Sequence, residues 1–190
     1  MFDSLSKSVI TGIITLGSMF QSTIYGVNAE FSSLDVYAKG GTIYVTSSLD
    51  NCFSPDLDEI FHTGQPIRIH YRIQMFSADL EIPFFQQNVF RELRYDLLDH
   101  YYFVQNSEDE ESIRCETLVN AKERLSIVDG FALLSRDLLN DGEQYYVKIT
   151  AYMDKIYLPE MDQEINLMHY WNKIRPEFQT EVFTADIFKK

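Results

Sequence analysis

Apolar and polar residues alternate along most of the chain from residue 30 onward. The alternation runs through residues 34–38, stops at Gly40 and Gly41, and resumes through residues 43–49. Successive side chains of a strand point to opposite faces, so a period of two predicts strands with one buried face. Two such segments joined by a glycine turn predict an opening hairpin.

The longest alternating segments lie further along the chain. Residues 67–76 place a set of apolar side chains on one face: Ile67, Ile69, Tyr71, Ile73 and Met75. Residues 145–153 repeat this pattern after a strong Asn140-Asp141-Gly142 turn. The same reasoning predicts further strands at residues 87–97, 101–105, 113–118 and 178–183.

Two short helices are expected between the strands. In the first, Ser54 is placed to cap the helix, Pro55 occupies its first turn and Gly64 ends it. In the second, apolar residues recur at helical spacing over residues 118–128. About seven or eight strands with two helical crossovers predict a mainly β fold, an antiparallel β-sandwich of immunoglobulin-like or similar type.

Residues 1–29 have the pattern of an export signal peptide. A weakly positive start precedes an apolar run at residues 9–20, and Val27 and Ala29 occupy the two positions that a signal peptidase reads. The run is shorter than the roughly 20 apolar residues that a membrane span needs. We therefore expect an exported protein of the bacterial periplasm or cell envelope, with residues 30–190 as a single β-rich domain and no stable membrane span after cleavage. The alternative is an amphipathic leader helix that stays attached.

The charge of the chain excludes some classes of partner. Lys and Arg number 16 against 29 Asp and Glu, which gives a formal net charge of −13. Nucleic-acid binding needs a basic surface, and docking on an anionic membrane needs basic segments. We therefore expect neither a nucleic-acid partner nor electrostatic membrane docking.

Cys52 and Cys115 are the two cysteines of the chain. In an oxidising compartment they could form a disulfide, which in the chain-entropy model adds roughly 3–4 kcal/mol of stability. The alternative is two buried free thiols. No matching pair of histidines accompanies the cysteines, so the sequence indicates no metal site, and no cofactor motif is present.

A set of short motifs spans most of residues 43–183. They are Phe53-Ser54-Pro55, Gly64-Gln65-Pro66 with residues 67–73, Leu93-Arg94-Tyr95-Asp96 with residues 101–104, Gly142-Glu143-Gln144-Tyr145, Leu158-Pro159 and Trp171. Together these motifs resemble the uncharacterised bacterial family called domain of unknown function 4390. The resemblance implies an export leader and a small β-rich extracytoplasmic domain, and it implies no activity and no catalytic residue.

Two groups of residues are candidates for binding a ligand or partner. The first is a basic stripe on two strands expected to pair: Arg68, His70, Arg72, Arg91 and Arg94. The second is Tyr146 and Tyr152 on the polar face of the strand at residues 145–153, because tyrosine suits a protein or glycan surface. The alternatives are cross-strand pairing of the arginines with Glu92 and Asp96, and burial of the tyrosines.

Two hypotheses of function follow. The first is a non-catalytic binding or accessory module for another envelope protein. The second is a small-ligand-binding or hydrolase-like protein, whose site would be assembled from remote residues such as His70, Asp96 and His100. No Gly-x-Ser-x-Gly elbow and no glycine-rich phosphate loop supports a standard enzyme class.

Overall fold

The computed structural model describes residues 26–159 and 162–188. Most of the predicted leader, residues 1–25, lies outside the described residues. Residues 26–29 are the part of the predicted leader that the structure describes. They contact the domain, because the Val27 N–H donates to the Tyr170 carbonyl oxygen at 2.8 Å. Within the described ranges, no helix has the length and apolar character that crossing a bilayer requires.

Strands make up most of the fold, as the alternation predicts. In chain order they are β1 (Glu30–Lys39), β2 (Thr42–Asp50), β3 (Ile67–Ser77), β4 (Phe85–Tyr95), β5 (Tyr102–Asn106), β6 (Ile113–Cys115), β7 (Ile127–Ser135), β8 (Gln144–Met153), β9 (Lys155–Leu158), β10 (Gln163–Asn166), β11 (Glu177–Gln179) and β12 (Phe183–Thr184). The helices are α2 (Pro55–Phe61), α3 (Leu118–Ser126), and the short 3-10 helices η1 (Arg136–Leu138), η3 (Leu167–Trp171) and η4 (Ala185–Phe188).

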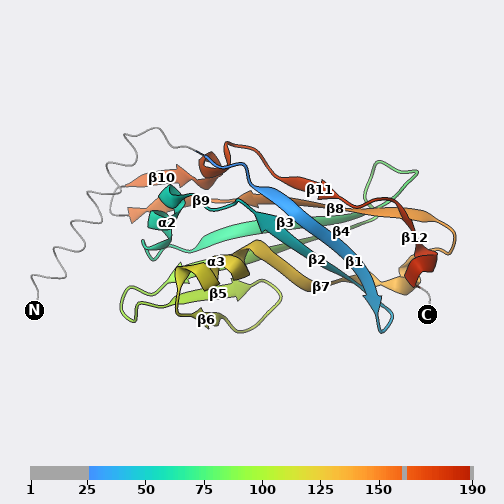
Figure 1. Ribbon diagram of the computed structural model, residues 1–190, viewed down its shortest axis with the longest axis horizontal. Helices are drawn as coiled ribbons and strands as arrows, with labels where there is room; N and C mark the ends of the chain where they lie inside the picture. Colours follow the sequence, from blue (N-terminus) through green and yellow to red (C-terminus); the bar gives the residue numbers. More distant parts are fainter. Residues whose placement is uncertain (1–25, 160–161, 189–190) are drawn as a thin grey trace, which may run out of the picture.

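Two antiparallel sheets form the body of the protein. The small sheet has the order β1-β2-β7, and the large sheet has the order β11-β8-β3-β4-β5-β6, with β12 also paired to β8. The small sheet lies across the large sheet (Figure 1), which confirms the predicted sandwich-like arrangement. Strands β9 and β10 form a separate two-stranded sheet.

The two α-helices of the described ranges form where the chain passes from one sheet to the other. Helix α2 connects β2 to β3, and α3 connects β6 to β7. The Ser54 hydroxyl accepts from the Leu57 N–H at 3.2 Å, which confirms the predicted cap. Thr117 caps α3 in the same way at 3.2 Å from Asn120 N. Because Thr117 begins the helix, β6 ends at Cys115, earlier than the sequence predicts.

The closing strand predicted at residues 178–183 is two short strands. Strands β11 and β12 pair with different parts of β8. Between them, the Thr180 hydroxyl accepts from the Val147 N–H at 3.0 Å and the Thr180 N–H donates to the Val147 carbonyl at 2.9 Å. This side-chain contact replaces one ladder hydrogen bond and interrupts the strand.

The core lies between the two sheets. The inward side chains of β3 are at most 1% exposed, and they are Ile67, Ile69, Tyr71, Ile73 and Met75. Two polar side chains inside this core have backbone partners: the Tyr71 hydroxyl donates to the Leu125 carbonyl at 2.8 Å, and the Trp171 indole N–H donates to the Cys52 carbonyl at 2.8 Å. Burial raises the pKa of Tyr71 well above its usual range, so its hydroxyl keeps the proton that this bond requires.

Tyr71→Phe should lower the free energy of unfolding by about 1–3 kcal/mol, because it leaves the buried Leu125 carbonyl without a donor. Urea unfolding followed by the fluorescence of Trp171, the single tryptophan, measures this loss. Tyr157→Phe is the matched control, since Tyr157 is 51% exposed and should change stability by less than about 0.5 kcal/mol. Equal losses of unfolding free energy in the two variants would show that the Tyr71–Leu125 hydrogen bond does not stabilise the core.

Candidate functional site

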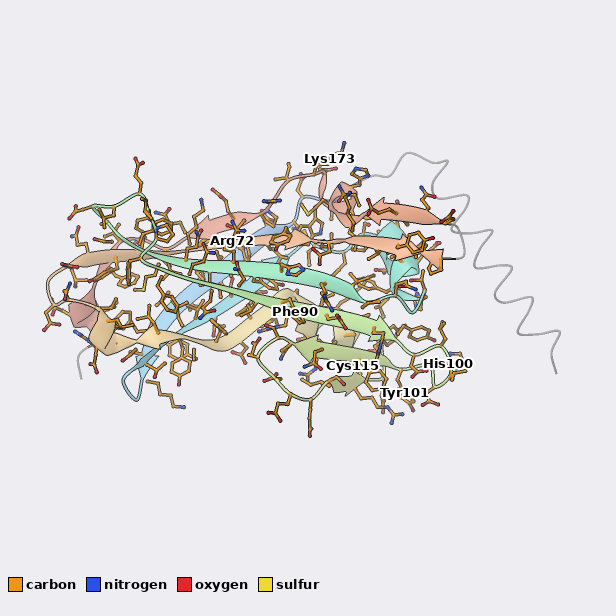
Figure 2. All side chains as sticks on the ribbon, turned by 180° about the vertical axis from the view of Figure 1, so that it is seen from behind. Arg72, Phe90, His100, Tyr101, Cys115 and Lys173 are labelled. Carbon is orange, nitrogen blue, oxygen red and sulfur yellow. The ribbon has the colours of Figure 1, made fainter. Side chains whose placement is uncertain are left out.

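The outward side chains of β3, β4 and β8 form one continuous surface with Asp154, Arg175 and Glu177 beside them, and we call this surface the outer face. The strand register places His70 between Phe90 of β4 and Tyr152 of β8, and it places Arg72 between Asn88 and Thr150. Figure 2 shows this side of the large sheet, with Arg72 and Phe90 near its middle. The small sheet covers the opposite side of the large sheet, so the outer face is the side free of the core.

His70 is held in a fixed orientation at the centre of the outer face. Its ring stacks on Tyr152 with centroids 4.7 Å apart and an interplanar angle of 8°. Its Nε2 lies 2.6 Å from a carboxylate oxygen of Asp154, and the Arg175 guanidinium lies 5.3 Å from the Tyr152 ring centroid. The result is a layered group of flat side chains with a cation at one end.

Arg68 and Arg72 flank His70 on β3, and they have different partners. Arg68 lies 5.0 Å from the Phe90 ring centroid, and its Nε is 2.5 Å from Glu92. The cross-strand pairing that the sequence leaves open is therefore present for Arg68. Among the described residues, the hydrogen-bond acceptor of Arg72 is Asn88, at a long distance of 3.4 Å.

The tyrosines predicted for the polar face of β8 lie on the outer face. Tyr146 stacks on Phe76 with centroids 4.8 Å apart and an interplanar angle of 4°, and Tyr152 stacks on His70. Both side chains are half-buried by these neighbours, so each presents part of its ring to solvent. Neither is enclosed by the core, which lies on the other side of β8.

The outer face is basic in an acidic chain. Its acidic members are Glu92, Asp154 and Glu177. Its basic members outnumber these and are Arg68, Arg72, Arg94, Lys148 and Arg175. This excess is local, since the whole chain carries −13. Asn88, Phe90 and Asp154 belong to this surface but have no distinctive sequence signal, because only the register brings them beside His70 and Arg72.

Arg91 does not belong to the basic stripe, and this corrects the sequence prediction. Arg91 and Arg94 are three residues apart on one strand, so their side chains point to opposite faces. Arg94 is exposed on the outer face, whereas the Arg91 side chain is 3% exposed on the inner side. Strand alternation alone was sufficient to separate the two residues.

Arg91 joins three segments of the chain at the edge of the core. Its two terminal nitrogens bind both carboxylate oxygens of Glu108, at 2.6 and 2.8 Å. Its Nε donates to the Ile127 carbonyl of β7 at 3.2 Å, and one terminal nitrogen donates to the Phe90 carbonyl at 3.1 Å. A bidentate pair of this kind is strong and geometrically specific. Arg91 therefore ties β4 of the large sheet to β7 of the small sheet.

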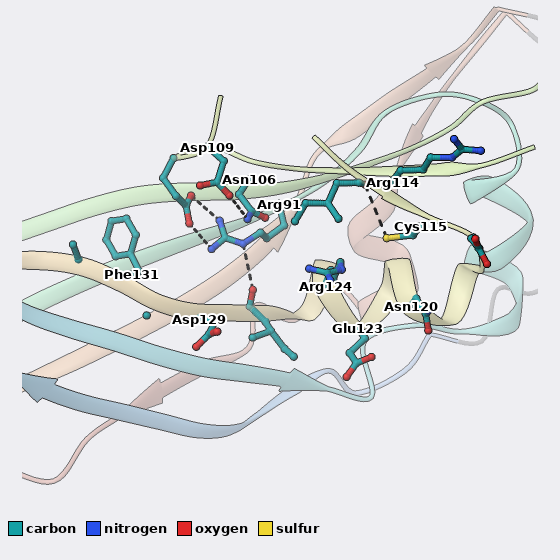
Figure 3. A pocket seen from close by; sticks show the side chains of 16 residues that line it. Arg91, Asn106, Asp109, Arg114, Cys115, Asn120, Glu123, Arg124, Asp129 and Phe131 are labelled. Carbon is teal, nitrogen blue, oxygen red and sulfur yellow. Dashed lines mark hydrogen bonds and ion pairs between the residues drawn. The ribbon is translucent and has the colours of Figure 1, made fainter. Parts of the chain in front are cut away.

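A cleft of about 1200 Å³ opens beside Arg91, and we call it the Arg91 cleft. Figure 3 shows Arg91 inside it, with β7 along one side and strands of the large sheet along the other. Its lining comes from the loop after β5, from β6, from one face of α3, and from Ile127 and residues 129–132. Sequence reasoning did not predict this cleft, because its walls meet only through the crossover of α3.

The residues proposed for a hydrolase-like site do not converge. His70 contacts Asp154, whereas the His100 Nδ1 lies 2.9 Å from the Tyr95 hydroxyl. The Asp96 carboxylate accepts the Leu98 and Asp99 N–H groups of its own turn, and these bonds lower its pKa. Phe90 lies beside His70, and Asp96 follows it by six residues, about 20 Å along the strand. Figure 2 places His100 at the end of the sheet, away from Phe90.

A different aromatic group surrounds His62, and the sequence reasoning missed it. The His62 Nε2 lies 2.8 Å from the Tyr102 hydroxyl, and its Nδ1 lies 2.8 Å from the Asp58 carbonyl. Tyr95 contacts both Tyr102 and His100. Burial, followed by the charges of Tyr95 and Asp58, raises the pKa of Tyr102. No group of metal-ligating side chains is found in the part of the chain that the structure describes.

Of the two alternatives for Cys52 and Cys115, the disulfide is wrong and the second is present: both are free, buried thiols. Cys52 follows β2 and lies against Trp171, whereas Cys115 ends β6, the outermost strand of the large sheet at that side. The fold therefore places them apart. Burial raises the pKa of Cys52 to about 12 and also raises the pKa of Cys115.

A family model matches residues 27–176 of the chain, and its description is a domain of unknown function (DUF4390). The chain belongs to this family. The match confirms the resemblance seen in the sequence motifs. The DUF4390 region includes the outer-face strands β3, β4 and β8 and the whole Arg91 cleft, and it ends before β11. No curated protein and no solved structure matches the chain significantly.

The folded protein should not react with a thiol reagent at pH 8, because both thiols are buried and their pKa values are raised. In denaturant both thiols should react. Counting the modified thiols by intact-protein mass spectrometry, without any reductant, measures this. An unfolded protein that still shows no free thiol would mean that the cysteines are bonded.

Arg91→Met should lower the free energy of unfolding by about 2–4 kcal/mol, because Glu108 loses its partner cation and the Ile127 carbonyl loses the Arg91 donor. The matched control is Arg94→Met on the same strand, which should cost less than about 0.5 kcal/mol because Arg94 is exposed. Urea unfolding curves of the two variants give the comparison. Similar stability of both variants would show that Arg91 does not tie the two sheets together.

Proposed function

We propose that this DUF4390 protein is exported to the bacterial envelope and acts there as a non-catalytic binding or accessory module for another envelope protein. We place its binding surface on the outer face. The observation that carries the proposal is the local basic and aromatic character of that face in a chain of net charge −13. The leader pattern of residues 1–29 supports export.

The side chains of the outer face are suited to binding another protein. Tyrosine and arginine supply much of the binding energy in protein interfaces, because flat groups lose little conformational entropy. Here the rings of Tyr146 and Tyr152 are already stacked on Phe76 and His70, so binding would cost little further ordering. The binding site would therefore be preorganised.

The charges of the outer face favour an acidic partner segment. Arg72 lacks a carboxylate partner among the described residues, and Lys148 is paired with Glu177, whose side chain is 60% exposed. A surface pair of this kind contributes little to stability, so an incoming carboxylate can replace Glu177. Opposite charge across an interface also accelerates the encounter of the two proteins.

A photo-crosslinking residue at Thr150, which lies beside Arg72 in the register of β3 and β8, should form a discrete adduct with one envelope protein in living cells. The same residue at Asp35, on the outward side of β1, should not form that adduct. Reversing charge with Arg72→Glu and Lys148→Glu should reduce the adduct roughly tenfold. The matched control is Lys39→Glu at the exposed end of β1, which should leave the adduct unchanged.

Two results would contradict the proposal. Equal adducts from Thr150 and Asp35 would remove the outer face as the binding surface. Recovery of the protein from the cytoplasmic fraction of the same cells would remove its export.

A further inference from the structure

The Arg91 cleft differs from an ordinary small-molecule pocket. Its volume of about 1200 Å³ exceeds the roughly 300–1,000 Å³ of typical ligand pockets. Charged and amide side chains form most of its lining, whereas small-molecule pockets are mostly apolar. Its shape and lining therefore fit a longer and more polar occupant.

One wall of the cleft is the edge of a strand. Consecutive residues from Asp129 to Ala132 line the cleft, and β7 has a β-bulge at Asp129 and Gly130, where its register against β2 shifts and the Gly130 N–H donates to the Thr46 hydroxyl at 3.0 Å. Strand β7 pairs with β2 on its other edge, and no strand within the described residues pairs with it on the cleft side. An unpaired strand edge offers N–H and C=O groups to an added strand.

Arg91 marks where the free edge of β7 begins. Its Nε donates to the Ile127 carbonyl, so the first outward carbonyl of β7 already has a partner. The residues beyond it, from Asp129 onward, have no such contact across the cleft within the described part of the chain. Four residues of free edge span about 13 Å, a length that a short strand can pair.

The excess of acidic side chains in the cleft favours a basic occupant. Its acidic side chains are Glu108, Asp109, Glu116, Glu123 and Asp129, and they outnumber its arginines. Glu108 is bound to Arg91, whereas Glu123 and Asp129 form no ion pair with any described residue. Both lie along the wall that α3 and β7 form (Figure 3).

We propose that the Arg91 cleft binds an extended, lysine- or arginine-bearing peptide segment, which adds to the free edge of β7 as a new strand. Main-chain hydrogen bonds to residues 129–132 provide the affinity, and carboxylates of α3 and β7 contact its basic side chains. This site lies on a different surface from the outer face and does not depend on the function proposed for that face.

The test uses three synthetic peptides on the ¹⁵N-labelled protein. The first is acetyl-Thr-Val-Lys-Val-Lys-Val-Thr-amide, the second has glutamate for both lysines, and the third has proline for the central valine. The lysine peptide should bind and shift the amide signals of residues 129–132. The glutamate peptide should not bind because of charge, and the proline peptide should not bind because it cannot complete the strand.

A double variant changes the charge of the site without touching the core. Glu123→Lys with Asp129→Lys should weaken binding of the lysine peptide roughly tenfold or more, since both side chains are exposed and their charge is reversed. The matched control is Asp35→Lys with Asp50→Lys on the small sheet, which should bind as the unmodified protein does. Absence of binding by the lysine peptide would overturn the proposal. Equal binding by the proline peptide, or amide shifts away from β7, would also overturn it.

Discussion

Burial of one face of the large sheet beneath β1, β2 and β7 determines where every other feature of this protein lies. On β3 the inward side chains from Ile67 to Met75 are at most 1% exposed, so the alternate residues Arg68, His70 and Arg72 have to face solvent. Neighbouring strands in register then bring Phe90, Asn88, Thr150 and Tyr152 beside them. The basic and aromatic outer face is thus a direct consequence of how the core is built.

The same packing explains the cleft. Where the small sheet ends at β7, apolar burial between the sheets ends too, and Arg91 with Glu108 provides the contact there. A charged pair that is mostly enclosed must satisfy its remaining hydrogen-bond donors, and the Ile127 and Phe90 carbonyls do so. Beyond this contact the edge of β7 remains open. The protein therefore has two separate surfaces of opposite local charge.

The sequence predicted the features that local patterns control. Period-two alternation predicted β3 and β8, their inward residues and the outward positions of His70, Tyr146 and Tyr152; the cap at Ser54 predicted α2. Features that depend on register or crossover were not predictable in this way. Asp154 reaches His70 only because β8 pairs with β3, and the cleft exists only because α3 carries the chain to the other sheet. Arg91 was misplaced although its spacing from Arg94 was sufficient to assign it.

We propose that a partner covers the outer face in the cell. Hydroxyl-radical labelling of tyrosines, compared between intact cells and the purified protein, measures this coverage. Tyr146 and Tyr152 should be protected in cells, whereas Tyr37 and Tyr157, which are 41% and 51% exposed on other surfaces, should be labelled equally in both. Equal labelling of Tyr146 and Tyr152 in cells and in the purified protein would show that no partner covers the outer face.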